Sequence, residues 1–353
     1  MNNFQSNVLK LLIERERTVG GVACVTVCHN EVLIINNFLD HYRSIGIRIF
    51  YIVDDNSTDG TFEILKEQKD VFLFKPTEKS EFKTDLPLWR QEILDFFLDG
   101  CWVSLPDIDE FLYYKQMPKP LEEVSKEMDA KSEEILIGAM IDMYQDKPLT
   151  RNKYSGERSL VEEFPFFDGQ AEPPFGIRII SQQKKYLNRF PTPEMLIKGG
   201  VRDRLFFQDG KSSWFQRWLI KKFANSKRPL NPNFLQKIQN EIVRRATKNM
   251  YSFDPPVLNK FALIKWRRGL KFRRAPHCVN EKMRVSEGLA AFLHFKFYKG
   301  EEMINYNVQR GQHTGDSTYY KKMLEKRDKL EISPICSCSK EFKGISSLSD
   351  ILR

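Results

Sequence analysis

The chain has 353 residues, a formal net charge of +9 and 41% apolar residues, values typical of a soluble globular protein with one large domain or two smaller ones. No apolar run approaches the roughly 18 residues of a membrane-spanning helix, and the first residues lack a signal-peptide layout, so we expect a cytoplasmic protein. Six cysteines in a chain of this length do not form a disulfide framework. Cys336 and Cys338 have no second Cys or His pair at zinc-finger spacing, so we expect no structural zinc.

Strands and helices are expected to alternate through the first hundred residues. Apolar and β-branched runs predict strands at residues 22–28, 47–53, 71–74 and 101–105. Apolar residues at helical spacing predict helices at residues 32–45, 61–68 and 86–98. This alternation predicts a parallel, Rossmann-like sheet with helices on both faces.

Three of the predicted strand ends carry polar loops, which read "CHNE", "DDNSTDG" and "PDIDE". Ligands of parallel sheets bind beyond the carboxyl ends of the strands, so we expect these loops to open on one edge. Asp107 and Asp109 in the third loop suit a hard divalent cation, Mn²⁺ or Mg²⁺. An isolated Asp-x-Asp also occurs often by chance, and the residues of the second loop are common in ordinary turns.

After residue 115 the pattern loosens. "EEILIGAMIDMYQDKP" predicts a strand with an acidic end, and residues 214–223 and 232–247 predict helices. "EGLAAFLHFKFYKGEEMINY" predicts a strand followed by a helix. We therefore divide the chain into a first half, residues 1–150, a second half, residues 151–325, with a basic helical insertion at 211–274, and a C-terminal extension, residues 326–353.

Taken in order, the motifs resemble a known family. "VCHNE", "VDDNSTDGT" and "DIDEF" are similar to the nucleotide-sugar-binding half of GT-A-fold glycosyltransferases, above all of glycosyltransferase family 2. "DMYQDKP", "GGVRDRLF", "LNKFALIKWRRG", "LHFKF" and "RGQHTGDSTYYKKM" extend the resemblance to a bacterial subgroup of that family. The resemblance covers roughly residues 20 to 325 and implies the GT-A fold, with residues 1–150 as the donor-binding half and residues 151–325 as the acceptor-side half.

The resemblance implies roles for individual residues. The strand-end pair Asp54 and Asp55 contributes to donor binding, with Asp55 on the uracil or ribose of the nucleotide. Glu31 lines the base pocket, and Arg90 lies near the base or the phosphates. Asp107 reaches the ribose and a metal-bound water, while Asp109 binds the metal that bridges the donor diphosphate, whose developing charge must be stabilised.

The general base has several candidates, because an inverting transfer needs a carboxylate or imidazole to take the acceptor proton. They are Asp142, Asp146, Asp203, His277 and His294. Asp142 closes a predicted strand and could face the site or cap a neighbouring loop, and His277 could be only a packed loop residue. Asp203 lies between two arginines, where an ion pair is at least as reasonable as catalysis. His294 and Lys296 share one face of a predicted strand, so His294 could ligate the metal or bind phosphate while Lys296 neutralises the leaving group. The alternative for His294 is a purely structural role, as a buried, hydrogen-bonded histidine of the core.

The positive charge is concentrated in residues 211–274, which hold 17 Lys or Arg and only two acidic residues. Within it, "SSWFQRWLIKKF" mixes aromatic residues with cations at helical spacing. This pattern suits peripheral binding to the inner face of an anionic membrane. The alternative interpretation is that the aromatic residues belong to the core. Trp214, Phe215, Trp218 and Trp266 among cations also suit nucleic acid, but no recognised module is visible and we expect no nucleic acid partner.

The favoured function is metal-dependent, inverting transfer of a sugar from a UDP-sugar to a glycan or lipid-linked acceptor in polysaccharide biosynthesis. A nucleotidyltransferase is the alternative, although "CHNEVLI" occupies the position of its usual glycine-rich loop. The same position lacks the glycine fingerprint of a Rossmann dehydrogenase, which excludes that class.

Overall fold

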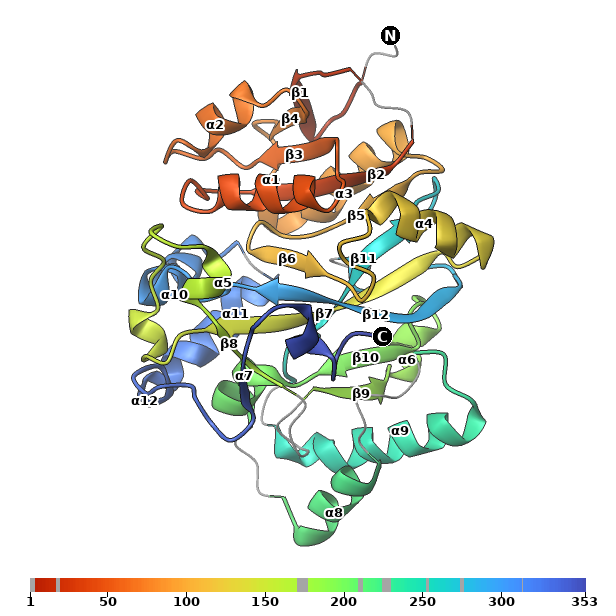
Figure 1. Cartoon of the computed structure of the whole chain (residues 1–353), viewed down its shortest axis with the longest axis vertical. Helices are drawn as coiled ribbons and strands as arrows, with labels where there is room; N and C mark the ends of the chain where they lie inside the picture. The colour runs from red at the N-terminus through yellow and green to blue at the C-terminus, as the bar shows by residue number, and fades with distance from the viewer. Residues whose placement is uncertain are drawn as a thin grey trace.

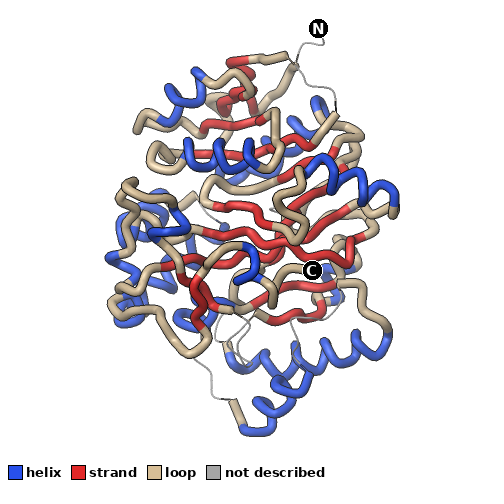
Figure 2. The backbone as a smooth tube through the Cα atoms, in the orientation of Figure 1, coloured by secondary structure: helices blue, strands red, loops and turns tan. Residues whose placement is uncertain are grey.

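The structure, a computed structural model, describes residues 4–16, 20–169, 177–208, 212–223, 230–251, 254–273, 276–312 and 314–353. Lys211 and Arg274, which bound the predicted basic insertion, and His313 of the last motif lie outside these ranges. A large central sheet runs through the molecule (Figures 1 and 2). Its main path has the order β1-β4-β3-β2-β5-β11-β7-β12-β6, and β8 and β13 extend it from β7.

The strands of the first half are β1 (Leu9–Ile13), β2 (Val22–Cys28), β3 (Phe50–Asp54), β4 (Val71–Pro76), β5 (Trp102–Ser104), β6 (Glu110–Tyr113) and β7 (Ile135–Tyr144). Those of the second half are β8 (Phe166–Asp168), β9 (Arg178–Ser181), β10 (Met195–Lys198), β11 (Asn259–Lys265), β12 (Val285–His294) and β13 (Ser339–Glu341). β9 and β10 form a separate two-stranded sheet. The predicted strands at 22–28, 71–74 and 101–105 are confirmed, and the one at 47–53 begins three residues later.

The helices are α1 (Ile35–Ser44), α2 (Thr61–Glu67), α3 (Phe82–Phe97), α4 (Leu121–Ala130), α5 (Leu160–Glu163), α6 (Lys184–Leu187), α7 (Gly200–Arg202), α8 (Trp214–Phe223), α9 (Phe234–Thr247), α10 (Gly300–Arg310), α11 (Thr314–Glu325) and α12 (Arg327–Leu330). Short segments of other helical types are η1 (Leu149–Arg151), η2 (Asp203–Phe207), η3 (Lys248–Met250) and η4 (Ile345–Leu348). In Figure 1, α1 and α4 lie in front of the sheet and α3 behind it. Helices therefore cover both faces, as expected.

The sheet is mixed, which corrects the expectation of a parallel one. β2, β3, β4 and β5 are parallel, but β11 enters antiparallel between β5 and β7, and β6 pairs antiparallel with β12. The strands that pair antiparallel come from distant parts of the chain, so no single helical crossover between them imposes a parallel direction. β6 ends the sheet path beside β12 and is separated from β5 by β11, β7 and β12.

Helices α8 and α9 pack on each other at the opposite end of the molecule from β1 (Figure 1). Trp214, Phe215 and Trp218 are 78%, 51% and 46% exposed, so the rival interpretation of these aromatics as core residues is wrong. Ile220 is the side chain of α8 that turns inward and is buried. Trp266 is fully buried in the main core, so it is not part of any basic–aromatic surface.

The C-terminal residues form part of the main body. β13 pairs with β8, the backbone of Arg353 pairs with that of Leu289, and Leu348, Ile351 and Leu352 join the main core. Within the described parts of the chain, every helix is too short or too polar to cross a bilayer.

Candidate active site

A cleft of about 910 Å³ opens where the strand order reverses, beyond the carboxyl ends of β2 and β5. The loop after β2 contributes His29, Asn30 and Glu31, and the loop after β5 contributes Asp107 and Asp109. Residues from the other end of the chain close the cleft, namely Lys296, Lys299, Glu302, Met303, Tyr306, Asn307, Arg310, Gln312 and Tyr320. Figure 1 shows α10 and α11 at the end of the sheet toward which β3 and β12 point. We call this space the first cleft; it is built by both halves of the chain.

The loops after β2 and β3 hold each other through side-chain to backbone hydrogen bonds. The backbone N–H of Asn30 donates to Ser57 Oγ at 2.9 Å, and that of Glu31 donates to Thr61 Oγ1 at 2.8 Å. Asn30 and Asn56 both adopt left-handed backbone angles, with φ of 56°, which asparagine tolerates better than most residues. Much of the polar sequence "DDNSTDG" therefore serves to fix the loops rather than to contact a ligand.

A charged network surrounds the carboxylates after β5. Asp107 Oδ1 lies 2.6 Å from the Arg90 guanidinium, and Asp107 Oδ2 lies 2.7 Å from Lys260 Nζ. Lys260 Nζ also lies 2.6 Å from Glu110 Oε2, and the same oxygen accepts the backbone N–H of Asp107. Burial alone would raise the pKa of Asp107, but Lys260 and Arg90 hold it well below its usual range. Glu110 therefore orients the loop by hydrogen bonding.

His294 lies at the centre of a second chain of contacts. Its Nδ1 is 2.6 Å from Asp142 Oδ1, and its Nε2 is 3.3 Å from Asp109 Oδ2. The other oxygen of Asp142 lies 2.7 Å from Arg202 Nε. The register of the sheet explains the alignment, because His294 pairs with Asp142 on β7 and with Glu110 on β6. Burial opposes protonation of His294, but its two carboxylate neighbours raise its pKa.

A second cleft, of about 710 Å³, adjoins the first and shares Asp107 and Lys296 with it. His277 and His294 line this second cleft, and α9 contributes Arg244 and Thr247. His277 Nδ1 lies 2.6 Å from the backbone carbonyl of Asn259, so this nitrogen carries the proton and donates it. Burial and Lys260 lower the pKa of His277 to about 4, which keeps the imidazole neutral at pH 7.

The structure brings most of the predicted site residues together. Glu31, Arg90, Asp107, Asp109 and Lys296 line the first cleft. Burial raises the pKa of Glu31 to about 7, against the effect of Lys299, and Tyr298 donates a hydrogen bond to its carboxylate.

The other predicted residues have different surroundings. Asp55 is 6% exposed and ion-paired with Arg310. Arg310 lines the first cleft, so Asp55 contacts a residue of the cleft wall. Asp54 is fully buried, accepts the backbone N–H of Ser57, and does not line either cleft.

Two of the aspartates weighed as the base have structural partners. Asp203 is buried against Arg178 rather than either of the arginines beside it in the sequence. Asp146 accepts a hydrogen bond from Ser333 Oγ and lies outside both clefts. Asp142 is held by Arg202 and His294, which lower its pKa to about 2 although burial opposes this.

Sequence reasoning missed Lys260, Arg202 and Arg310 as site residues. Lys260 and Arg202 lie in the motifs "LNKFALIKWRRG" and "GGVRDRLF", in which the sequence alone indicates no role for either side chain. The apolar run Phe261–Ile264 after Lys260 is typical of a buried strand. That signal could have placed Lys260 at the buried start of a strand.

The donors around Asp109 fit a divalent cation. His294 turns Nδ1 toward a carboxylate and Nε2 toward Asp109, which is the arrangement that orients a metal-ligating histidine. Asp107, Asp109 and His294 do not all lie within 4.8 Å of one another, and in the described ranges only Asp168, Cys336 and Cys338 do. Arg204 binds Asp168 with two nitrogens at 3.1 Å, which places a cation where a metal would need a free carboxylate.

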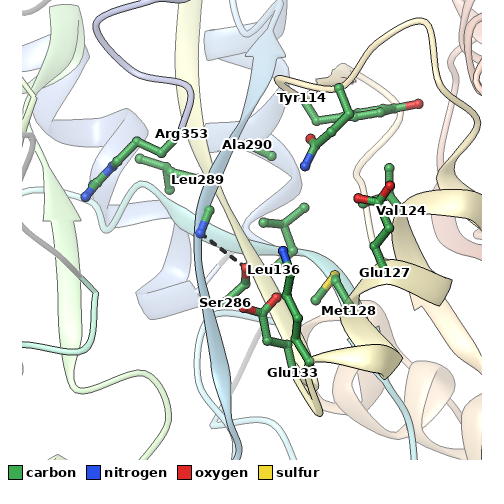
Figure 3. Close-up of a pocket in the computed structure, with 13 residues that line it drawn as sticks. Tyr114, Val124, Glu127, Met128, Glu133, Leu136, Ser286, Leu289, Ala290 and Arg353 are labelled. Atoms are coloured by element: carbon green, nitrogen blue, oxygen red, sulfur yellow. Dashed lines mark hydrogen bonds between the residues drawn. The ribbon is translucent and has the colours of Figure 1, made fainter.

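A small cavity of about 40 Å³ lies away from both clefts (Figure 3). It is lined by α4, the starts of β7 and β12, and the C-terminal Arg353. Gly288 N–H donates to Ser286 Oγ at its wall. Its volume is far below the roughly 300–1,000 Å³ of small-molecule sites, so we interpret it as a packing gap.

Comparisons with known proteins give little. No known family model and no curated protein matches the sequence. A solved structure described as a glucose-1-phosphate thymidylyltransferase from Bacillus anthracis, in complex with sucrose, is similar to 40% of this chain, at 8% identity and a TM-score of 0.25. The match spans 63% of that structure's own chain, less than two thirds. A likeness at this level says nothing about the reaction.

Proposed function

We propose that this chain transfers a sugar from a nucleotide sugar, a UDP-sugar, to a glycan or lipid-linked acceptor. The proposal rests on one observation. The two clefts meet at Asp107 and Lys296, and Asp109 and His294 lie beside this meeting point. The first cleft lies at a reversal of strand order, where open α/β sheets bind nucleotides. The second cleft leaves room for an acceptor on the other side of the same residues. Of the motifs that resemble family 2 glycosyltransferases, "VCHNE", "DIDEF", "GGVRDRLF", "LHFKF" and "RGQHTGDSTYYKKM" contribute residues that line these two clefts.

The cations of the first cleft suit a nucleoside diphosphate leaving group. Lys296 Nζ lies 3.9 Å from Asp109 Oδ2 and faces both clefts, so it is placed to bind the departing diphosphate. Asp109 and Nε2 of His294 would hold Mn²⁺ or Mg²⁺, which supplies positive charge to the leaving group. Asp142 and Arg202 position His294 from behind.

His277 is our candidate for the group that accepts the proton of the acceptor hydroxyl. It lines the second cleft, and its Nδ1–H is committed to the Asn259 carbonyl. The remaining nitrogen, Nε2, is then an unprotonated acceptor at neutral pH. Asp142 is less suited to this role, because both of its oxygens bind cationic or donor groups.

The test is a hydrolysis and transfer screen over a panel of nucleotide sugars, with and without Mn²⁺. We expect release of UDP in the presence of Mn²⁺, and stabilisation of the protein by UDP with Mn²⁺ in a thermal melt. A parallel reaction supplies nucleoside triphosphates with sugar 1-phosphates. Pyrophosphate release there, without UDP release from any nucleotide sugar, would replace our proposal with the nucleotidyltransferase alternative.

A further inference from the structure

Exposed apolar side chains gather on α8 and α9. Twelve large apolar side chains are exposed among the described residues, and half of them lie on these two helices. They are Trp214, Phe215, Trp218, Phe234, Leu235 and Ile238. We call this set the α8–α9 face. A concentration of this kind marks an interaction surface, whereas single exposed apolar residues do not.

The face extends over two helices, whereas the sequence pattern indicates a possible membrane-binding side for α8 alone. On α9, Asn240, Val243, Ala246 and Thr247 are buried, while Phe234, at 76% exposed, and Leu235, at 67%, face the solvent. Each helix thus buries a few side chains against the protein and exposes several large apolar side chains to solvent. Figure 1 shows them together at one end of the molecule.

Positive charge borders the apolar residues. The described stretches 212–223 and 230–251 contain seven Lys or Arg and a single acidic residue, Glu241. Lys222 Nζ lies 4.8 Å from the centre of the Trp218 ring, and Trp218 stacks on Phe215 at 5.9 Å between ring centres. On α9, Lys237 is paired with Glu194, and both arginines are paired with Glu241.

We infer that the α8–α9 face docks on the surface of an anionic lipid bilayer. Aromatic and aliphatic side chains would enter the interface, and the cations beside them would meet anionic headgroups. A second copy of this chain fits less well, because a symmetric contact would bring the α8 lysines of two copies together. A single-stranded nucleic acid would leave the aliphatic Leu235 and Ile238 without stacking partners.

Docking through the α8–α9 face would also orient the second cleft, and the role of that cleft rests on the proposed function. α9 carries the exposed Phe234 and Leu235 near its start and lines the second cleft with Arg244 and Thr247 near its end. Docking would therefore hold the second cleft close to the bilayer, where a lipid-linked acceptor resides.

The experiment is flotation of the full chain with vesicles of phosphatidylglycerol and phosphatidylcholine, and with phosphatidylcholine vesicles alone. We expect co-flotation with the anionic vesicles at low salt and its loss at 1 M salt, where the screening length falls to about 3 Å. Lys221→Gln/Lys222→Gln should weaken partitioning about thirty-fold, and Trp214→Ser/Trp218→Ser roughly ten-fold or more.

Two control variants match these changes elsewhere on the molecule. Lys66→Gln/Lys69→Gln removes the same charge from α2 and the residues after it, and Ile332→Ser/Ile335→Ser removes apolar side chains that are 47% and 38% exposed. Both should float like the wild-type chain. Flotation needs no donor or catalysis, so its outcome is independent of the screen for sugar transfer.

Three results would overturn the inference. The first is no co-flotation at low salt, and the second is equal partitioning of the α8 variants and their controls. The third is binding of the face to another partner without flotation. That partner would be a second copy, seen as a dimer by light scattering that Trp214→Ser/Trp218→Ser abolishes, or an oligonucleotide in a gel-shift assay.

Discussion

Lys260→Met is the substitution whose cost follows most directly from the structure. Lys260 is 1% exposed and lies 2.6 Å from Glu110 Oε2 and 2.7 Å from Asp107 Oδ2. Methionine has a similar volume and no charge, so packing is kept while both ion pairs are lost. Glu110, also 1% exposed, would then be a buried carboxylate without its cation.

The two lost pairs contribute unequally. The side chain of Asp107 is 49% exposed and keeps Arg90, so its share is screened by solvent and small. Glu110 keeps the neutral backbone N–H of Asp107 as a donor. Removing one partner of a buried ion pair costs about 3–5 kcal/mol, and we assign most of that range to Glu110. A second change, Glu110→Gln, removes the stranded charge and should recover about 2 kcal/mol or more.

Urea denaturation of the wild type, both single variants and the double variant measures these terms as one cycle. Lys265→Met is the matched control on the same strand, because its pair with Asp129 is about 40% exposed on both sides and should matter by less than about 1 kcal/mol. A Lys260→Met variant within 1 kcal/mol of the wild type would refute the reasoning. So would a double variant whose loss equals the sum of the two single losses.

Four further substitutions test the first cleft. Asp109→Asn should remove the shift in melting temperature produced by Mn²⁺ and abolish donor hydrolysis while leaving the fold intact, and normal Mn²⁺-dependent behaviour would contradict its assignment as a ligand. Asp55→Ala should weaken UDP binding by about 1–3 kcal/mol in calorimetry. Because Asp55 is paired with Arg310, Arg310→Ala should weaken UDP binding by a comparable amount. Unchanged affinity for UDP in both variants would exclude this pair from the donor site. Glu31→Gln should alter the pH dependence of stability. Burial raises the pKa of Glu31 from 4.5 to about 7, in spite of Lys299 and Tyr298, so the wild type has the full contribution of this group below pH 4.5 and loses it as the pH rises through 7. In urea denaturation between pH 5 and pH 8, the variant should gain up to about 3 kcal/mol relative to the wild type, and a constant difference would show that Glu31 titrates normally.

The first half of the fold could be predicted from the sequence because its signals are local. β2, β3 and β4 are nearly continuous apolar runs that are buried on both faces, and each is separated from the next by a helix. β11 and β6 could not be placed in this way. β11 pairs with β5 and β7, more than 100 residues earlier, and β6 is a four-residue strand that follows the carboxylates directly. Their positions depend on contacts between distant segments.

The same difference applies to the candidate site. Asp107 and Asp109 are visible in the sequence because carboxylates are dense at a predicted strand end. Lys260, the partner of Asp107, is not, since it lies more than 150 residues away along the chain. His294 is a candidate from the sequence, but its contact with Asp109 is not predicted there. In a count of charges, Lys260 belongs to the basic insertion and would be assigned to the surface. In the fold it is the cation that balances a buried carboxylate.

The basic insertion shows where periodicity stops being informative. The spacing of Trp214, Trp218 and Lys222 establishes that they share one side of a helix, but not whether that side faces the core or the solvent. Burial of Ile220 settles the question, because it turns α8 so that its aromatic side faces outward. An amphipathic helix normally buries its bulkier apolar side. α8 and α9 both leave that side exposed beside a row of cations, so we expect it to be covered by an anionic surface rather than by the protein itself.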